Sequence, residues 1–119
     1  MINNKGDEGA NAWGKPAAWV DYYGQIDGRS YGVAIFDHKE NLRHPTTWHA
    51  RDYGLFAVNP FGLHDFNLGA KGAGDHTVPL GGSLRFRYRV FFHHGDTKVS
   101  QVVEQFSAYA DPPVCAVKW

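Results

Sequence analysis

The sequence has 119 residues, of which 43% are hydrophobic and 15% aromatic, which is enough for one domain with a core but short for two. The 12 basic side chains balance the 12 acidic ones. A protein that binds nucleic acid would carry a basic excess, so we expect no nucleic-acid partner. No apolar run approaches the roughly 20 residues that a membrane helix needs, so we expect a soluble protein with no membrane partner.

The first residues are polar and contain no apolar stretch of the kind found in a signal peptide. We interpret residues 1–15 as a flexible segment and residues 16–119 as a single domain. We expect a secreted or periplasmic protein whose leader has been removed, with a cytoplasmic protein as the alternative. The single cysteine, Cys115, excludes an internal disulfide. We interpret it as a small buried hydrophobic residue, with a link between two chains as the alternative.

Short runs of β-branched and aromatic residues, separated by turn residues, predict strands rather than helices. The expected strands, in chain order, are residues 17–23, 31–37, 47–50, 53–58 and 83–93. Asp27-Gly28 is the hairpin signal between the first two. Glycine-rich residues 63–78 predict a mobile loop, and residues 101–109 predict a last strand or a short helix.

This succession predicts an all-β fold, a compact β-sandwich or cupin-like jelly roll in one domain. Exposed strand edges need cover in so small a sheet, and a homodimer would supply it.

The long run 83–93 has two different faces, because side chains alternate along a strand. One face carries Phe86, Tyr88, Val90 and Phe92, and we predict that it faces the core. The other carries Arg87, Arg89, Phe91 and His93. That second face is either ordinary solvent-exposed surface or the floor of a binding cleft, where arginine forks bind hydroxyl and carboxylate groups.

Histidines are unusually dense, with seven in the chain and three of them, His38, His44 and His49, in residues 37–51. Pro45 biases His44 toward an extended conformation. We predict that His44, His49 and His93 converge on one metal ion with an open coordination position. Imidazole ligands without a thiolate favour copper, with zinc as the alternative. The competing interpretation makes these histidines structural, hydrogen-bonded groups.

Two weaker patterns concern carboxylates and aromatic residues. Asp21 and Asp37 lie in or at the end of expected strands and are candidates for an acid–base pair. Sugar rings stack on flat aromatic side chains. The candidates for such a stacking platform are Trp13, Trp19, Trp48 and Tyr53, and we expect at least two of them to pack in the core instead.

The runs DHKENLRHPTTWHARDYGLFAVNPFG, residues 37–62, and SLRFRYRVFFHHGD, residues 83–96, resemble the bacterial "methane oxygenase PmoA"-like family. The resemblance extends from about Trp19 to Asp96 and corresponds to the C-terminal part of longer members. The matching positions are Asp37, His38, Arg43, His44, Pro45, Trp48, His49, Arg51, Tyr53, Gly54, Asn59, Pro60, Phe61, Gly62, Arg87, Tyr88, Arg89, His93 and Gly95. The family label is misleading, because the methane monooxygenase subunit is an integral membrane protein.

The resemblance implies a β-sandwich related to carbohydrate-active folds, in bacteria that degrade plant or algal polysaccharides, and implies no settled reaction. Our first hypothesis is a copper enzyme that oxidises a cellulose-like polysaccharide. His44, His49 and His93 would hold the metal, with His38 or Tyr53 near the open position. The residues that would orient the polysaccharide or oligosaccharide are Trp48, Arg87 and Arg89. The alternatives are a metal-free sugar epimerase or hydrolase, with histidine and carboxylate as acid and base, and a non-catalytic carbohydrate-binding module.

Overall fold

The structure is a computed structural model that describes residues 1–118. Its centre is a hairpin of β2 (Trp19–Ile26) and β3 (Arg29–Asp37). Asp27 and Gly28, which connect the two strands, both have positive φ angles, 50° and 75°. Two successive positive φ angles define the tight hairpin turn whose twist matches that of the strands, and Asp-Gly is among its preferred sequences. The predicted hairpin is therefore confirmed.

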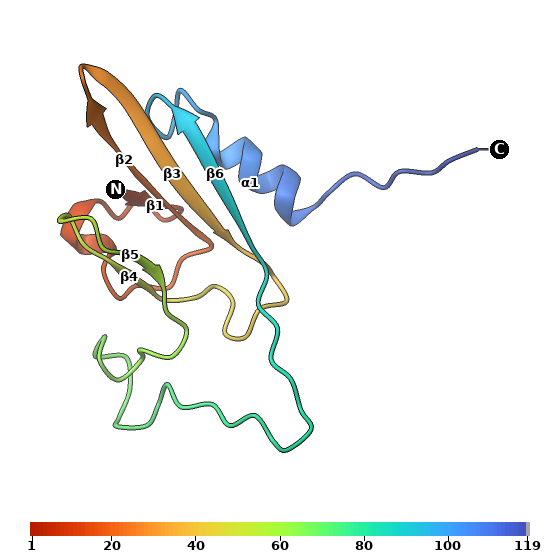
Figure 1. Cartoon of the computed structure of the whole chain (residues 1–119). Coiled ribbons are helices and arrows are strands. Elements are labelled where there is room, and N and C mark those ends of the chain that lie inside the picture. Colours follow the sequence, from red (N-terminus) through yellow and green to blue (C-terminus); the bar gives the residue numbers. More distant parts are fainter. Residues whose placement is uncertain (119) are drawn as a thin grey trace.

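Two more strands complete a four-stranded antiparallel sheet with the order β1-β2-β3-β6 (Figure 1). β1 (Ile2–Asn3) pairs with β2, and β6 (Tyr88–His94) pairs with β3. In the register of the second pair, Tyr31 lies opposite His94 and Asp37 lies opposite Tyr88. The two ends of β6 are therefore fixed to the two ends of β3.

A small second sheet and one helix cover opposite faces of the first sheet (Figure 1). The second sheet consists of β4 (Trp48–Ala50) and β5 (Phe56–Val58). Its Trp48 packs with Ala17 and Val20, and Ile35, Phe56 and Val58 surround this cluster. The all-β fold predicted from the sequence is confirmed.

The helix α1 (Val102–Ala110) lies over the other face, where Trp19, Ala34 and Phe36 form the core. Its apolar residues Val102, Phe106 and Tyr109 recur at helical spacing and pack on that core. The segment predicted as a last strand or a short helix is thus a helix. At nine residues, α1 is far too short to cross a bilayer, and no other helix in residues 1–118 is long and apolar enough to do so.

Residues 1–15, predicted to be flexible, contribute β1 and the 3-10 helix η1 (Gly9–Ala12). The buried Asn3 side chain organises this segment, because its carbonyl oxygen accepts hydrogen bonds from the Lys5 and Asp7 backbone amides, at 2.9 and 3.0 Å. Ala12 is fully buried. The hydrogen bonds of Asn3 join a side chain to the backbone, so the periodicity of hydrophobic residues does not predict them.

The prediction of which face of β6 meets the core is wrong. Phe92 is 75% exposed, and Val90 and Tyr88 on the same face are also exposed. His93 is buried, and Phe91 packs against the core beneath α1. The reason is tertiary: α1 covers the face that carries His93, whereas the β4–β5 sheet packs on the opposite face of β2 and β3 and leaves β6 uncovered.

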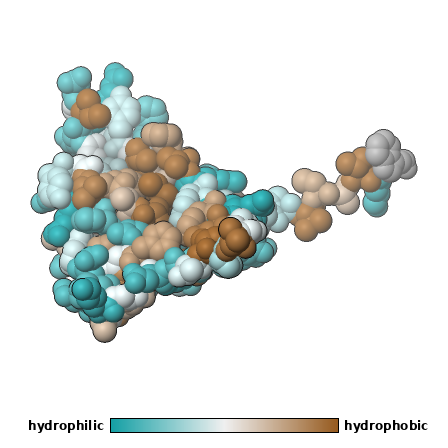
Figure 2. Space-filling model, turned by 60° about the horizontal axis from the view of Figure 1, so that its bottom comes forward, coloured by the Kyte–Doolittle hydropathy of each residue, from teal (hydrophilic) through white to brown (hydrophobic). Residues whose placement is uncertain are grey.

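The C-terminal end of the chain is more exposed than the sequence predicts. Figure 2 shows apolar side chains gathered in the middle of one face and again along the extended chain toward the C-terminus. Cys115 lies in this extended part and is exposed, so its interpretation as a buried residue is wrong.

Candidate functional site

A buried carboxylate and a partly exposed imidazole form a close pair at the end of β3. His44 Nδ1 lies 2.7 Å from Asp37 Oδ2. The Asp37 side chain is completely buried, whereas 24% of the His44 side chain remains exposed. The chain returns to Asp37 through residues 38–44, where a turn brings the backbone amide of His44 to the carbonyl of Asn41. A seven-residue separation in sequence therefore becomes a direct contact.

The Asp37 carboxylate is held by two further hydrogen bonds. Asn41 Nδ2 donates to Oδ1 at 2.8 Å, and the Thr46 backbone amide donates to Oδ2 at 3.1 Å. The same Asn41 amide group also bonds to the carbonyl and the amide of Arg87, which fastens the entry of β6 to this loop. With donors on both oxygens, the carboxylate has a fixed orientation.

Arg43, which precedes His44, binds the backbone of residues 60–75. Its guanidinium donates to three carbonyl oxygens, those of Pro60, Gly74 and Asp75, at 2.7, 2.8 and 3.0 Å. The glycine-rich loop predicted to be mobile is therefore held by Arg43 at its neighbouring residues Gly74 and Asp75. The peptide bond between His44 and Pro45 is cis.

The orientation of the pair assigns the protons on His44. A carboxylate oxygen accepts hydrogen bonds, so Nδ1 of His44 donates to Asp37. In the neutral ring the lone pair is then on Nε2, the nitrogen that Asp37 does not contact. A carboxylate behind an imidazole selects the tautomer and stabilises the protonated ring. With Nδ1 engaged by Asp37, Nε2 is the ring nitrogen left for another partner.

His93 lies farther back along β3, opposite Gly32 and on the face that α1 covers. Its Nε2 lies 2.8 Å from Asp21 Oδ1, and its Nδ1 lies 2.7 Å from the Ser100 hydroxyl. The side chain is 2% exposed and Asp21 is fully buried. Ser100 also donates to the carbonyl of His94, and Thr97 donates to the second oxygen of Asp21. Although a serine, a histidine and an aspartate are in contact, the buried ring has both nitrogens occupied and links β2 to the turn before α1.

His49 lies on β4, away from both His44 and His93. It follows the buried Trp48 on β4, so its side chain points away from the core between the sheets. Its ring makes edge contacts with Trp13 and Phe66, with centroid distances of 6.3 and 5.8 Å. This is an aromatic environment on the outer side of the β4–β5 sheet.

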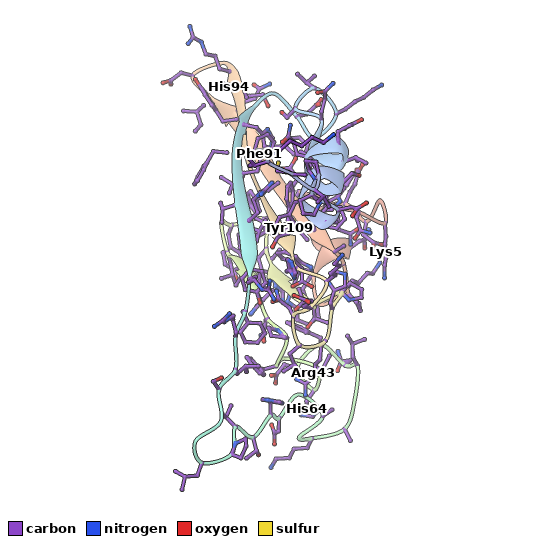
Figure 3. The ribbon with its side chains drawn as sticks, turned by 90° about the vertical axis from the view of Figure 1, so that its right-hand side faces the viewer. Lys5, Arg43, His64, Phe91, His94 and Tyr109 are labelled. Carbon is purple, nitrogen blue, oxygen red and sulfur yellow. The ribbon has the colours of Figure 1, made fainter. Side chains whose placement is uncertain are left out.

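The predicted meeting of His44, His49 and His93 on one ion is therefore wrong. The contacts of His93 at Gly32 and of His44 at Asp37 are five residues apart on β3, or about 16 Å at the usual rise per residue, whereas ligands lie about 2 Å from a metal. Figure 3 shows the same separation, with His94 at one end of the molecule and Arg43 near the other. No three His, Cys, Asp or Glu side chains in residues 1–118 are grouped to hold a metal. Copper and zinc stay predictions for metal analysis to test.

Two other predicted site residues lie elsewhere. Trp48 is fully buried and its indole N–H donates to the carbonyl of Ala17 at 2.8 Å, so it has no face for a sugar to stack on. Tyr53 is 76% exposed in the turn between β4 and β5. The Tyr22 hydroxyl holds this turn against the middle of β2, away from His38.

Three predicted residues do come together, beside the edge of β6. His38, Arg87 and Arg89 line an open hollow of about 750 Å³ together with Phe86, Tyr88 and Tyr109. Arg87 forms an ion pair with Glu40. The Arg89 guanidinium carbon lies 4.7 Å from the centre of the Tyr109 ring. For convenience we call this region the β6 hollow.

The charge of Asp37 extends to the β6 hollow. Tyr88 is 36% exposed, and the partial burial of its side chain, with a further contribution from Asp37, raises its pKa to about 12. Burial also raises the pKa of Tyr109, which Arg89 lowers and Asp37 raises. Both phenols are therefore neutral near neutral pH, and both can donate hydrogen bonds.

Comparison with protein families matches residues 1–107 to a family of unknown function, DUF6807. The chain belongs to DUF6807. The match covers every residue of the Asp37–His44 site and most of the β6 hollow. No match was found among curated proteins or among solved structures. The resemblance to "methane oxygenase PmoA"-like proteins stays a prediction, because the DUF6807 match does not name that family.

Sequence reasoning missed the residues that hold the site together. Asn41, Thr46 and Tyr109 carry no motif, and their roles depend on contacts made across the fold. The sequence does contain one signal for Asp37 and His44. Both lie in the histidine-rich segment of residues 37–51, and Asp37 is one of the two carboxylates that the sequence predicts as an acid–base pair. Nothing in the spacing paired them with each other.

Proposed function

We propose that the Asp37–His44 pair is the acid–base centre of a metal-independent enzyme that acts on a hydroxylated, sugar-like substrate. The observation that carries the proposal is the 2.7 Å contact between a partly exposed imidazole and a fully buried carboxylate that makes three hydrogen bonds in all. In this arrangement Nε2 of His44 accepts a proton from a substrate hydroxyl. Asp37 is a positioning residue that holds the ring and stabilises its protonated form.

The reaction class that fits is the interconversion of sugar anomers, as in a mutarotase-like reaction. Nε2 of His44 removes the proton of the anomeric hydroxyl while the bond between the anomeric carbon and the ring oxygen breaks, and the ring oxygen takes up a proton from water. The reverse steps close the ring on either face of the carbonyl and return the protons. The sugar-like substrate is supported by the resemblance to carbohydrate-associated proteins and by the aromatic and arginine side chains of the β6 hollow, whose Arg87 backbone is joined to Asp37 through Asn41. The copper-dependent oxidation of a polysaccharide is the second candidate. A histidine ligand also commonly donates its other ring nitrogen to a carboxylate, as His44 does, but the two further predicted ligands lie elsewhere.

The first test measures interconversion of the anomers of reducing sugars by polarimetry and ¹H NMR. Asp37→Asn keeps the shape of the side chain but removes its charge, and His44→Gln removes the base. We expect each to lower kcat by about 10²- to 10⁴-fold, the usual contribution of a general base. His64→Gln, a substitution of an exposed histidine in the loop, is the matched control and should leave the rate unchanged.

Metal dependence separates the two candidates. Activity should survive exhaustive chelation, and protein purified without an affinity tag should contain no stoichiometric copper or zinc. Loss of activity on chelation, with recovery on adding copper, would support the oxidative hypothesis and contradict ours. A ¹⁵N NMR spectrum that shows His44 protonated on Nε2 alone would contradict the acid–base role directly, whatever the substrate.

A further inference from the structure

The β6 hollow contains a cation without a counter-ion. Arg89 has no carboxylate within ion-pair distance in residues 1–118, and its guanidinium rests on the ring of Tyr109. Arg87, two residues earlier on the same face of β6, is already paired with Glu40. The hollow therefore has one unneutralised guanidinium beside one ion pair.

Two further donors accompany Arg89. Nδ1 of His38 accepts a hydrogen bond from the Glu40 backbone amide at 3.2 Å, which leaves Nε2 as the ring nitrogen that carries a proton. The His38 ring lies edge-on to Tyr109, with a centroid distance of 5.6 Å. The Tyr109 hydroxyl is buried and has no hydrogen-bond partner in the part of the chain that the structure describes. A buried donor without an acceptor is unfavourable, and a ligand oxygen entering the hollow would supply one.

Aromatic groups complete the lining, and an acidic group lies beside it. Phe86 and Tyr88 are stacked with a centroid distance of 6.0 Å and line the hollow from the other face of the strand, around its edge from the arginines. Glu40 is not part of the lining, but its ion pair with Arg87 places an acceptor for hydroxyl groups and a negative charge beside it. That charge disfavours a doubly charged phosphate more than a singly charged carboxylate. The guanidinium fork matches the planar, two-oxygen geometry of a carboxylate.

We propose that the β6 hollow binds the carboxylate of an acidic sugar, with Arg89, His38 and Tyr109 as its donors. This names the substrate class of the acid–base centre and in that respect rests on the proposed function. The sugar ring would lie on Phe86 and Tyr88, and its hydroxyls would reach Glu40. Burial raises the pKa of the Tyr109 phenol, so the hydroxyl keeps its proton and can donate it in a hydrogen bond.

The test is a titration of the full chain with sodium D-glucuronate, D-glucose and sodium acetate, followed by ¹H–¹⁵N NMR including the arginine Nε signals. Glucuronate should shift the signals of Arg89 and Tyr109. Glucose and acetate should bind at least about tenfold more weakly, since each lacks one of the two recognised parts. Arg89→Gln should weaken glucuronate binding at least about tenfold, and rising salt should weaken it as well.

The matched control is Arg29→Gln, which removes an exposed arginine at the opposite end of the sheet and should leave binding unchanged. Equal responses to acetate and glucuronate, or glucuronate binding that Arg89→Gln leaves intact, would overturn the proposal. His44→Gln separates the two proposals, because it should retain glucuronate binding while losing any anomerase activity. Activity on neutral sugars without glucuronate binding would overturn this inference and leave the acid–base centre standing.

Discussion

The imidazole of His93 lies 2.8 Å from the carboxylate of Asp21, and both side chains are buried between the four-stranded sheet and α1. A buried pair of this kind leaves an uncompensated polar group when one partner is removed. We expect Asp21→Asn and His93→Gln each to lower the free energy of unfolding by about 3 kcal/mol, measured by urea denaturation. His94→Gln, next to it but exposed, should change it by less than about 0.5 kcal/mol. A small effect at both buried positions would show that the pair is dispensable.

Gly32 provides the space for the His93 ring. A Cβ at this position would lie 2.3 Å from His93 Cε1, and the ring is fixed by Asp21 and Ser100. Gly32→Ala should therefore destabilise the protein by about 1–3 kcal/mol through overpacking. Gly24→Ala in the neighbouring strand, where no atom lies within 4 Å, is the control for the loss of a glycine. Equal midpoints for the two variants in urea would refute the steric explanation.

The three carbonyl contacts of Arg43 make the loop around residues 60–75 dependent on one side chain. Lysine keeps the charge but cannot hold three carbonyls with a planar fork. We expect Arg43→Lys to lower stability by about 2 kcal/mol and to increase the rate of limited proteolysis within this loop. Arg85→Lys, an exposed position, serves as the comparison. Unchanged cleavage in Arg43→Lys would mean that the loop is held by other contacts.

Alkaline titration should reveal the raised pKa of Tyr88. Burial, and then Asp37, raises its pKa from 10.0 to about 12, so the folded state keeps this proton where the unfolded chain loses it. The resulting stabilisation is present below pH 10 and is lost as the pH rises through about 12. Absorbance at 295 nm should show a late ionisation that disappears in Tyr88→Phe. Tyr53→Phe, at an exposed position, is the control and should leave this late ionisation in place.

The tautomer of His44 can be measured without any substrate. In the wild type we expect ¹⁵N NMR to show the neutral ring protonated on Nδ1, because that nitrogen donates to Asp37. In Asp37→Asn the amide replaces an acceptor oxygen, and the preference should weaken. The same preference in both proteins would mean that Asp37 does not set the proton position.

The sequence by itself determined the elements that depend on neighbouring residues. Alternating apolar runs predicted the central strands, and Asp27-Gly28 predicted their turn, since both signals are local. The histidine-rich segment from Asp37 to Arg51 is also predicted from composition as the likeliest place for a functional site. These predictions needed only the backbone preferences and the side-chain period of each stretch.

Only the tertiary structure decided which partners meet. Alternation along β6 separates its side chains into two faces, but α1 decides that His93 rather than Phe92 is covered. Register then places His93 opposite Gly32, five residues along β3 from Asp37 and His44, so that each histidine meets its own aspartate. The physical reason is that a histidine binds whatever polar group the fold brings within hydrogen-bond distance, and that distance is set by strand pairing and not by sequence spacing.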